Sequence, residues 1–106
     1  MNIIIGNAWP YANGPLHLWR IAVWLPGDIL ARYHRMMGDN VVFLSGTDCH
    51  GAPINNRAEE ESISPLEAVK KYHNEFKKCF KDLGFSFDIF EKHILNIMKT
   101  WWRIKG

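Results

Sequence analysis

Two short loops hold the residues of this sequence whose types and spacing suit a ligand site. The first, "WPYANGPLHLWR", brings His17 and Arg20 to the start of a helical pattern, behind a stiff stretch of proline, glycine and asparagine. Free backbone N–H groups at a helix N-terminus and an imidazole both suit phosphate oxygens. The loop therefore indicates a nucleotide site. A proline- and glycine-rich connector with a capping histidine is the alternative interpretation.

The second loop, "GTDCHGAP", contains Asp48, Cys49 and His50. The Asp48 carboxylate suits an ammonium group, or it caps the next helix. Cys49 beside His50 is a weak sign of a thiol nucleophile or a metal pair. Adjacent residues in a loop rarely converge on one atom, and no third group is evident. We therefore expect no metal site in this chain.

The elements around these loops predict that both lie at the same edge of a parallel sheet. Apolar runs rich in strand formers cover residues 3–8 and 41–45, and a helical spacing of apolar residues covers 17–37. Pro26 is expected to kink this helix, and Gly38 is expected to end it. The strand–helix–strand order predicts a parallel pair with a right-handed crossover. Because ligands bind beyond the carboxyl ends of such strands, we expect a cleft there lined by Trp9, Tyr11, His17, Asp48 and His50.

The rest of the sequence predicts mainly helices. The apolar positions of the first helix are Leu18, Ile21, Ala22, Leu25, Ile29, Tyr33 and Met36. A short polar helix is expected at 54–61, and "SPLE" at 64–67 has the pattern of a capping box that starts a longer helix ending near Gly84. Residues 86–90 look extended, and the tail 93–106 is compatible with a helix. Nothing in that tail is expected to complete the sheet.

Length and composition restrict the function classes. The 106 residues make one domain or part of one, and the apolar fraction of 47% is enough for a core. A net charge of +2 gives no strong argument for a nucleic-acid partner, and the lysines at 70, 77, 78 and 81 are interpreted as a solvated face rather than an RNA-binding stripe. The sequence lacks a membrane-length apolar run and a signal-peptide pattern. We expect a cytoplasmic protein without a membrane partner, in which Cys49 and Cys79 are free thiols.

A longer pattern adds a family resemblance. "AWPYANGPLHL", followed by "LPGDILARYHRMMGDNVVFLSGTDCHGAPI", resembles the amino-terminal part of methionyl-tRNA synthetase, particularly of the archaeal and eukaryotic type. The resemblance is clear from about residue 3 to residue 90 and unclear for 91–106. It implies an α/β fold in which residues 1–106 form the incomplete first half of a Rossmann-type, doubly wound parallel sheet. The family activates methionine with ATP to methionyl-adenylate and then transfers methionine to tRNA.

The resemblance also implies roles for individual residues. The family signature His-x-Gly-His falls on "HLWR", so His17 matches its first histidine and Arg20 stands at a degenerate second position as the other catalytic candidate. The residues implied to bind ATP are Asn13, Gly14, Pro15, His17 and Trp19. Those implied to bind methionine are Ala8, Trp9, Tyr11 and Asp48, with Asp48 facing the amino group. ATP is then a substrate that arrives with Mg²⁺, and no zinc site is expected here.

Two departures from the family pattern open alternatives. Trp19 replaces the signature glycine, which normally leaves room for adenine, and the family's second half-sheet, its Lys-Met-Ser-Lys-Ser loop and its anticodon-binding domain are not encoded in these residues. We expect the chain alone to be inactive, as a truncated, decayed or split ligase with a complementing carboxy-terminal chain as a further partner. A catalytically dead module that binds methionine or a partner chain is the main alternative. A small-molecule nucleotidyltransferase fits the two loops less well.

Overall fold

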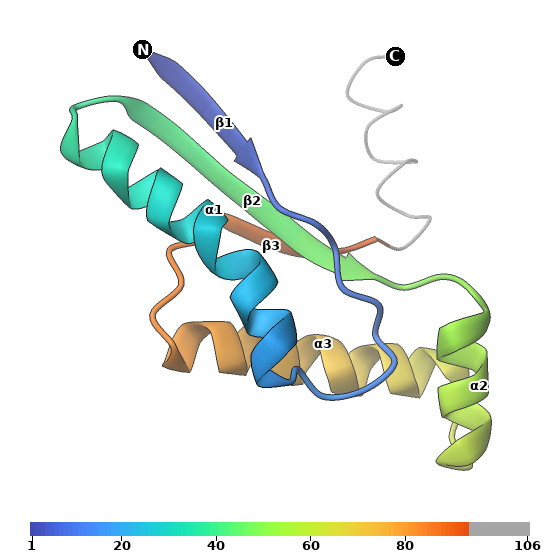
Figure 1. Cartoon of the computed structure of the whole chain (residues 1–106). Coiled ribbons are helices and arrows are strands. Elements are labelled where there is room, and N and C mark those ends of the chain that lie inside the picture. Colours follow the sequence, from blue (N-terminus) through green and yellow to red (C-terminus); the bar gives the residue numbers. More distant parts are fainter. Residues whose placement is uncertain (94–106) are drawn as a thin grey trace, which may run out of the picture.

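The structure, a computed structural model, describes residues 1–93 and contains a parallel sheet with helices between its strands (Figure 1). Residues 94–106, most of the tail for which a helix was considered, lie outside the described residues. Within the described residues, the order of elements is β1 (Asn2–Gly6), α1 (Leu18–Met36), β2 (Asn40–Asp48), α2 (Ala52–Glu60), α3 (Pro65–Asp82) and β3 (Ile89–His93).

The sheet has the strand order β1-β2-β3, and all of its neighbours are parallel. The predicted parallel pair of β1 and β2 is therefore confirmed, with Ile5 opposite Phe43. Two boundaries were wrong. The stretch expected to be extended at 86–90 forms a third strand at Ile89–His93, which includes the first residue of the tail, and β2 continues to Asp48 instead of ending at residue 45. Both differences have one cause, because the last residues of β2 pair with β3.

Both long helices cover the same face of the sheet. Ala31 of α1 packs with Ile5 and Phe43, while His73 of α3 reaches Thr47 on the same face of β2. In Figure 1 both helices lie below the strands, as two right-handed crossovers in the same direction require. On the other face, the side chain of Ile4 is 77% exposed. Parallel sheets normally bury both faces, but within the described residues the second face is open around Ile4.

Helix α1 turns a different side toward the sheet than its apolar spacing suggested. Its buried residues are Trp24, Asp28 and Ala31, and the helix continues through Pro26. Several members of the apolar stripe are exposed instead, namely Leu18, Leu25, Ile29, Tyr33 and Met36. The buried side is selected by specific contacts: the Trp24 indole donates a hydrogen bond to the carbonyl of Ala8 at 2.7 Å, and the small Ala31 leaves room for Phe43.

Helix α3 begins at the predicted capping box. The Glu67 backbone N–H donates to Ser64 Oγ at 3.2 Å, and the Ser64 backbone N–H donates to Glu67 Oε2 at 2.9 Å. This reciprocal pair satisfies two N–H groups that the first turn leaves without helical partners. The buried side of the helix consists of Ala68, Val69, Tyr72, His73, Phe76 and Phe80. Leu66 and Leu83 at the two ends of the helix are exposed.

A buried carboxylate holds the segment that leads into β3. Asp28 of α1 accepts hydrogen bonds from the backbone N–H and the hydroxyl of Ser86, both at 2.6 Å, and from Arg32 at 2.7 Å. Burial raises the pKa of this carboxyl, but the hydrogen bonds from Ser86 and Arg32 outweigh burial and leave the pKa below its usual value. Next to it, Arg35 donates to Asp88 at 2.8 Å. These contacts place β3 beside β2, although they join residues more than 50 positions apart.

The buried His73 gives the fold a pH dependence. Its Nδ1 lies 2.8 Å from the hydroxyl of Thr47, and its ring stacks on Phe90 with centroids 5.6 Å apart. Burial, with Lys92 and Lys77 nearby, lowers the pKa of the imidazole to about 4 from an ordinary value of 6.5. The unfolded chain therefore binds a proton at His73 that the folded chain does not bind until lower pH.

We expect the free energy of unfolding to fall by about 2 kcal/mol between pH 7 and pH 5 through His73 alone. The sign follows from the lowered pKa, because acidification through 6.5 protonates the unfolded state first. Urea unfolding at a series of pH values measures this loss, and His73→Gln should flatten the profile. An NMR titration of the wild-type imidazole provides a check that needs no variant. A ring that titrates near pH 6.5 in the folded protein would contradict the prediction.

Candidate functional site

The first loop, residues 7–17, leaves β1 at its carboxyl end and stays beside the end of β2 before α1 begins (Figure 1). The Asp48 backbone N–H donates to the carbonyl of Pro10 at 2.8 Å, and the Ala12 N–H donates to the carbonyl of Asp48 at 3.1 Å. Tyr11 thereby forms an isolated parallel bridge with Asp48. The loop behaves as a short continuation of the sheet, and this fixes the position of the residues that follow it.

The second half of this loop encloses a cavity of about 290 Å³, which we call the loop cavity. Its lining consists of Asn13, Gly14, Pro15, His17, Trp19, Arg20 and Arg57. The five residues expected to bind ATP are all in this set, together with Arg20. The lining includes two guanidinium groups and an imidazole and contains no aspartate or glutamate. Such a lining favours an anionic ligand.

His17 stands at the N-cap of α1 with extended backbone angles, and its side chain makes no capping hydrogen bond to the helix. The first turn of α1 also has no acidic residue, so its N–H groups and helix dipole remain favourable for an anion. His17 therefore occupies the N-cap position, but its side chain does not cap the helix. The alternative interpretation of His17 as a capping side chain is wrong. His17 is one of the residues that line the loop cavity.

Trp19 and Arg20 lie against each other at the mouth of the loop cavity. The Arg20 Cζ is 5.4 Å from the centroid of the Trp19 ring, and Arg20 Nη1 and Nη2 each lie 3.5 Å from Asn13 Oδ1. Trp19 is 65% exposed, so it lines the cavity without being part of the core. The indole thus holds the guanidinium by a cation–π contact and at the same time occupies space next to the loop.

The residues expected to bind methionine follow the end of β2. Asp48 is half-buried and accepts the His50 backbone N–H on Oδ1 at 3.2 Å, while the N-cap of α2 is Gly51. Asp48 therefore does not cap α2. The Tyr11 side chain is 44% exposed, and its ring lies 3.9 Å from the place that a Cβ on Gly51 would take.

Ala8 and Trp9 both have structural contacts with the last part of β2. The carbonyl of Ala8 accepts hydrogen bonds from Trp24 and from Ser45 Oγ. The Trp9 ring packs so closely on Gly46 that a Cβ there would come within 2.5 Å of it. A glycine is thus required at residue 46 by this close approach. The residues expected to bind methionine do not line the loop cavity; these are Ala8, Trp9, Tyr11 and Asp48. The residues expected to share a single cleft therefore form two separate sets.

Arg57 is the residue of the loop cavity that sequence reasoning missed. It comes from α2, the short helix interpreted only as a polar connector. The signal that could have found it is its position: α2 follows the Asp48 loop, and so lies at the same edge of the sheet. One basic residue in a polar helix carries no pattern of its own, however, and only the folding back of α2 brings it to the first loop.

The loop that contains Cys49 and His50 is held by a hydrogen bond of its own. Cys49 is buried and donates its thiol hydrogen to the carbonyl of Thr47 at 3.2 Å. Neither Cys49 nor Cys79 is part of a disulfide bond. Among residues 1–93, no group of three His, Cys, Asp or Glu side chains is placed to hold a metal ion. In the same part of the chain, no helix is long and apolar enough to cross a membrane.

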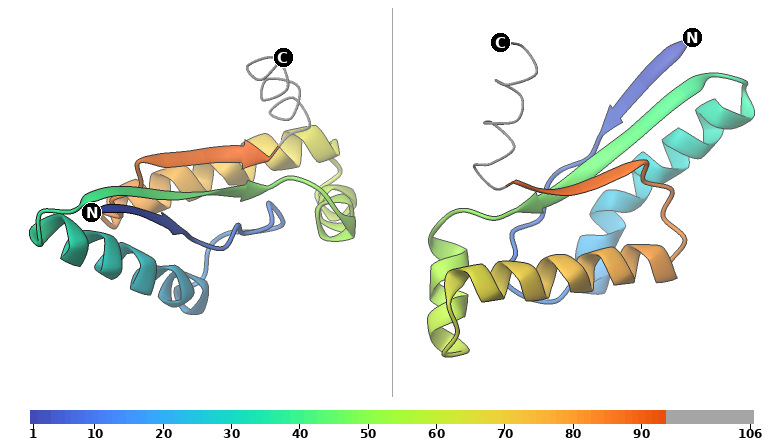
Figure 2. Two further views of the ribbon diagram at one scale, coloured as in Figure 1. Left: turned by 90° about the horizontal axis from the view of Figure 1, so that it is seen from above. Right: turned by 180° about the vertical axis from the view of Figure 1, so that it is seen from behind.

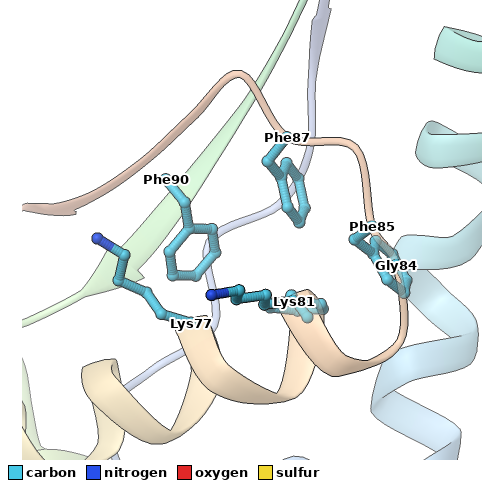
Figure 3. Close-up of a pocket in the computed structure, with 7 residues that line it drawn as sticks. Lys77, Lys81, Gly84, Phe85, Phe87 and Phe90 are labelled. Atoms are coloured by element: carbon cyan, nitrogen blue, oxygen red, sulfur yellow. The ribbon is translucent and has the colours of Figure 1, made fainter.

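A second cavity of about 280 Å³ lies between the end of α3 and the segment leading to β3 (Figure 3). Phe80, Phe85, Phe87 and Phe90 form its aromatic lining, with Lys77, Lys81 and Gly84 around them. Figure 3 shows Phe87 and Phe90 pointing toward α3. Two of the exposed lysines of α3 thus border an aromatic cavity. It contains none of the expected site residues, so the loop cavity remains the candidate site.

The comparisons with known proteins agree with this geometry. The family model described as tRNA synthetases class I (M) matches residues 3–97, a range that includes both loops. A methionine–tRNA ligase of Alkaliphilus oremlandii is 58% identical over 87% of this chain and 17% of its own length. A methionine–tRNA ligase of Bacillus cereus is 51% identical over 98% of this chain and 20% of its own length. These relatives are bacterial, so they do not support the archaeal and eukaryotic type.

A solved structure is similar as well. The methionyl-tRNA synthetase of Mycobacterium tuberculosis, in complex with methionyl-adenylate, superposes with a TM-score of 0.81 at 26% identity, over 84% of this chain and 18% of that chain. The chain therefore spans about a fifth of the length of the proteins it matches. Its three parallel strands correspond to an incomplete Rossmann-like sheet in a larger catalytic domain. On the family match and these identities, the chain belongs to the class I tRNA synthetases (M).

Proposed function

We propose that this chain supplies the methionine- and ATP-binding part of a methionine–tRNA ligase. The observation that carries the proposal is the loop cavity, where His17, Arg20 and Arg57 gather around the start of α1 without an acidic neighbour in the lining. A triphosphate is an anion of this kind, and helix N-termini commonly bind phosphate. Methionine lies beside the cavity in this proposal, along Tyr11 and the end of β2.

In the proposed reaction, a carboxylate oxygen of methionine attacks the α-phosphorus of ATP and pyrophosphate leaves. Asp48 accepts hydrogen bonds from the methionine ammonium group, and the ring of Tyr11 packs against the thioether side chain. His17 donates a hydrogen bond to a phosphate oxygen as negative charge develops there, which is the role of a preorganised donor. ATP arrives as its Mg²⁺ complex, and methionine is then transferred to tRNA in the complete cytoplasmic enzyme.

A second candidate function is a binding module that no longer forms adenylate. The specific observation in its favour is Trp19, whose indole lines the loop cavity at the position where the family has glycine. A module of this kind would still bind methionine, because Tyr11 and Asp48 lie outside that cavity. The same chain could then serve as a docking partner for a complementing carboxy-terminal chain.

One experiment distinguishes the two functions. The 106-residue chain is mixed with a separately produced carboxy-terminal part of the Bacillus cereus ligase, and methionine binding and methionine-dependent ATP–pyrophosphate exchange are measured. Binding together with exchange is the result expected for a ligase part. Binding without exchange supports the module. A chain that binds neither methionine nor ATP would contradict both functions.

A further inference from the structure

Arg57 reaches the loop cavity from a different element than every other residue of its lining. The other six belong to the continuous stretch 13–20, whereas Arg57 belongs to α2. Its side chain is 35% exposed, so part of it remains accessible. A cation brought to an anion-type cavity by a separate helix is a candidate ligand contact that no sequence motif indicates.

A network on α2 and α3 holds the Arg57 guanidinium in place. Nε donates to Glu61 Oε1 at 2.9 Å and to Tyr72 Oη at 3.1 Å, and Nη1 donates to Glu60 at 3.3 Å. Cζ also lies 5.8 Å from the centroid of the Tyr72 ring. These contacts engage Nε and Nη1, so they fix the plane of the guanidinium and hold the Nη2 N–H groups in a defined direction.

The two acidic partners of Arg57 are not dedicated to it alone. Glu61 also accepts hydrogen bonds from Lys71 Nζ at 3.1 Å and from the hydroxyl of Tyr72, so its charge is shared among three donors. Glu60 is 67% exposed at its side chain, where water screens its pairing with Arg57. Neither glutamate lines the cavity. An anion there meets Arg57 together with Arg20.

We propose that Arg57 is a binding residue for the polyphosphate of the nucleotide in the loop cavity, held in position by Glu61 and Tyr72. The proposal rests on the proposed function and extends it, because it adds a contact from α2 to those from the first loop. Arginine suits this role because its planar fork can bind two phosphate oxygens at once. Arg20 and Arg57 would then contact the polyphosphate from two separate elements.

The test measures binding of inorganic tripolyphosphate to the 106-residue chain by calorimetry at constant ionic strength. Arg57→Gln should weaken binding at least about tenfold, the scale of one charge-assisted hydrogen bond. Arg57→Lys should fall between wild type and Arg57→Gln, because it retains the charge and loses the fork. Lys70→Gln is the matched control: it removes one positive charge from the exposed face of α3 and should leave binding within twofold of wild type.

Three results would overturn the proposal: wild-type protein that does not bind tripolyphosphate, Arg57→Gln that binds within twofold of wild type, or Lys70→Gln that weakens binding as much as Arg57→Gln. Circular dichroism checks that each variant is folded. If Arg57→Gln fails to fold, modification of wild-type arginines with phenylglyoxal tests the contact instead. Tripolyphosphate should protect Arg57 from modification. Equal modification of Arg57 with and without tripolyphosphate would refute the contact. Methionine binding is measured in parallel. Absence of methionine binding would count against the proposed function. The role of Arg57 would still be decided by the binding of tripolyphosphate.

Discussion

Trp19→Gly is expected to raise methionine-dependent ATP–pyrophosphate exchange by about 100-fold when this chain is joined to the remaining part of the Bacillus cereus ligase. The indole lines the loop cavity where the family glycine leaves room for adenine. A reactant displaced by about 1 Å can lose a factor of about 10² in rate. An indole in the space that glycine leaves for adenine would displace the nucleotide by more than this. Arg20→His should recover less activity, because Arg20 already supplies a cation beside Asn13.

The matched control for this experiment is Trp19→Phe. It retains an aromatic ring at the cavity and should give little gain, whereas a general effect of removing an exposed indole would appear in both variants. The KM for ATP should fall in Trp19→Gly together with the rise in rate. A fusion in which Arg20→His alone restores exchange, or in which Trp19→Gly changes nothing, would show that the indole leaves adenine enough space.

Asp48→Asn should weaken methionine binding by roughly 1.5–3 kcal/mol, which is about 10- to 150-fold in Kd. The substitution retains the shape of the side chain and an oxygen that can accept the His50 N–H, so the turn after β2 should be unchanged. What it removes is the negative charge that faces the methionine ammonium group in the proposed function. Calorimetric titration with methionine measures the effect in the fusion described above.

Asp82→Asn serves as the charge control for this prediction. Asp82 is an exposed carboxylate at the end of α3, where it pairs with Lys78, and its loss should leave methionine affinity unchanged. If Asp48→Asn also leaves the affinity unchanged, the contribution of Asp48 is limited to the hydrogen bond within its own turn. A large loss in both variants would indicate a long-range charge effect rather than a direct contact.

Much of the local structure could be predicted because its causes lie within a few residues. Ser64 and Glu67 determine the start of α3 by bonding each other's backbone, and this needs no other part of the chain. Gly38 takes a φ of +84° after α1, a conformation that glycine adopts at little cost. The parallel pairing of β1 and β2 follows from the strand–helix–strand order. The same order explains why the loops that contain His17 and Asp48 lie at one edge of the sheet.

The sequence by itself therefore determined which segments form the first two strands and the helices, and which loops meet at the carboxyl ends of the strands. Only the tertiary structure decided which side of α1 is buried, because that choice depends on contacts such as Trp24 with Ala8 and Asp28 with Ser86. It also decided where β2 ends, since its last residues become strand only when β3 pairs with them. Arg57 joins the loop cavity for the same reason: contacts between residues distant in sequence have no local pattern, and their geometry exists only once the chain has folded.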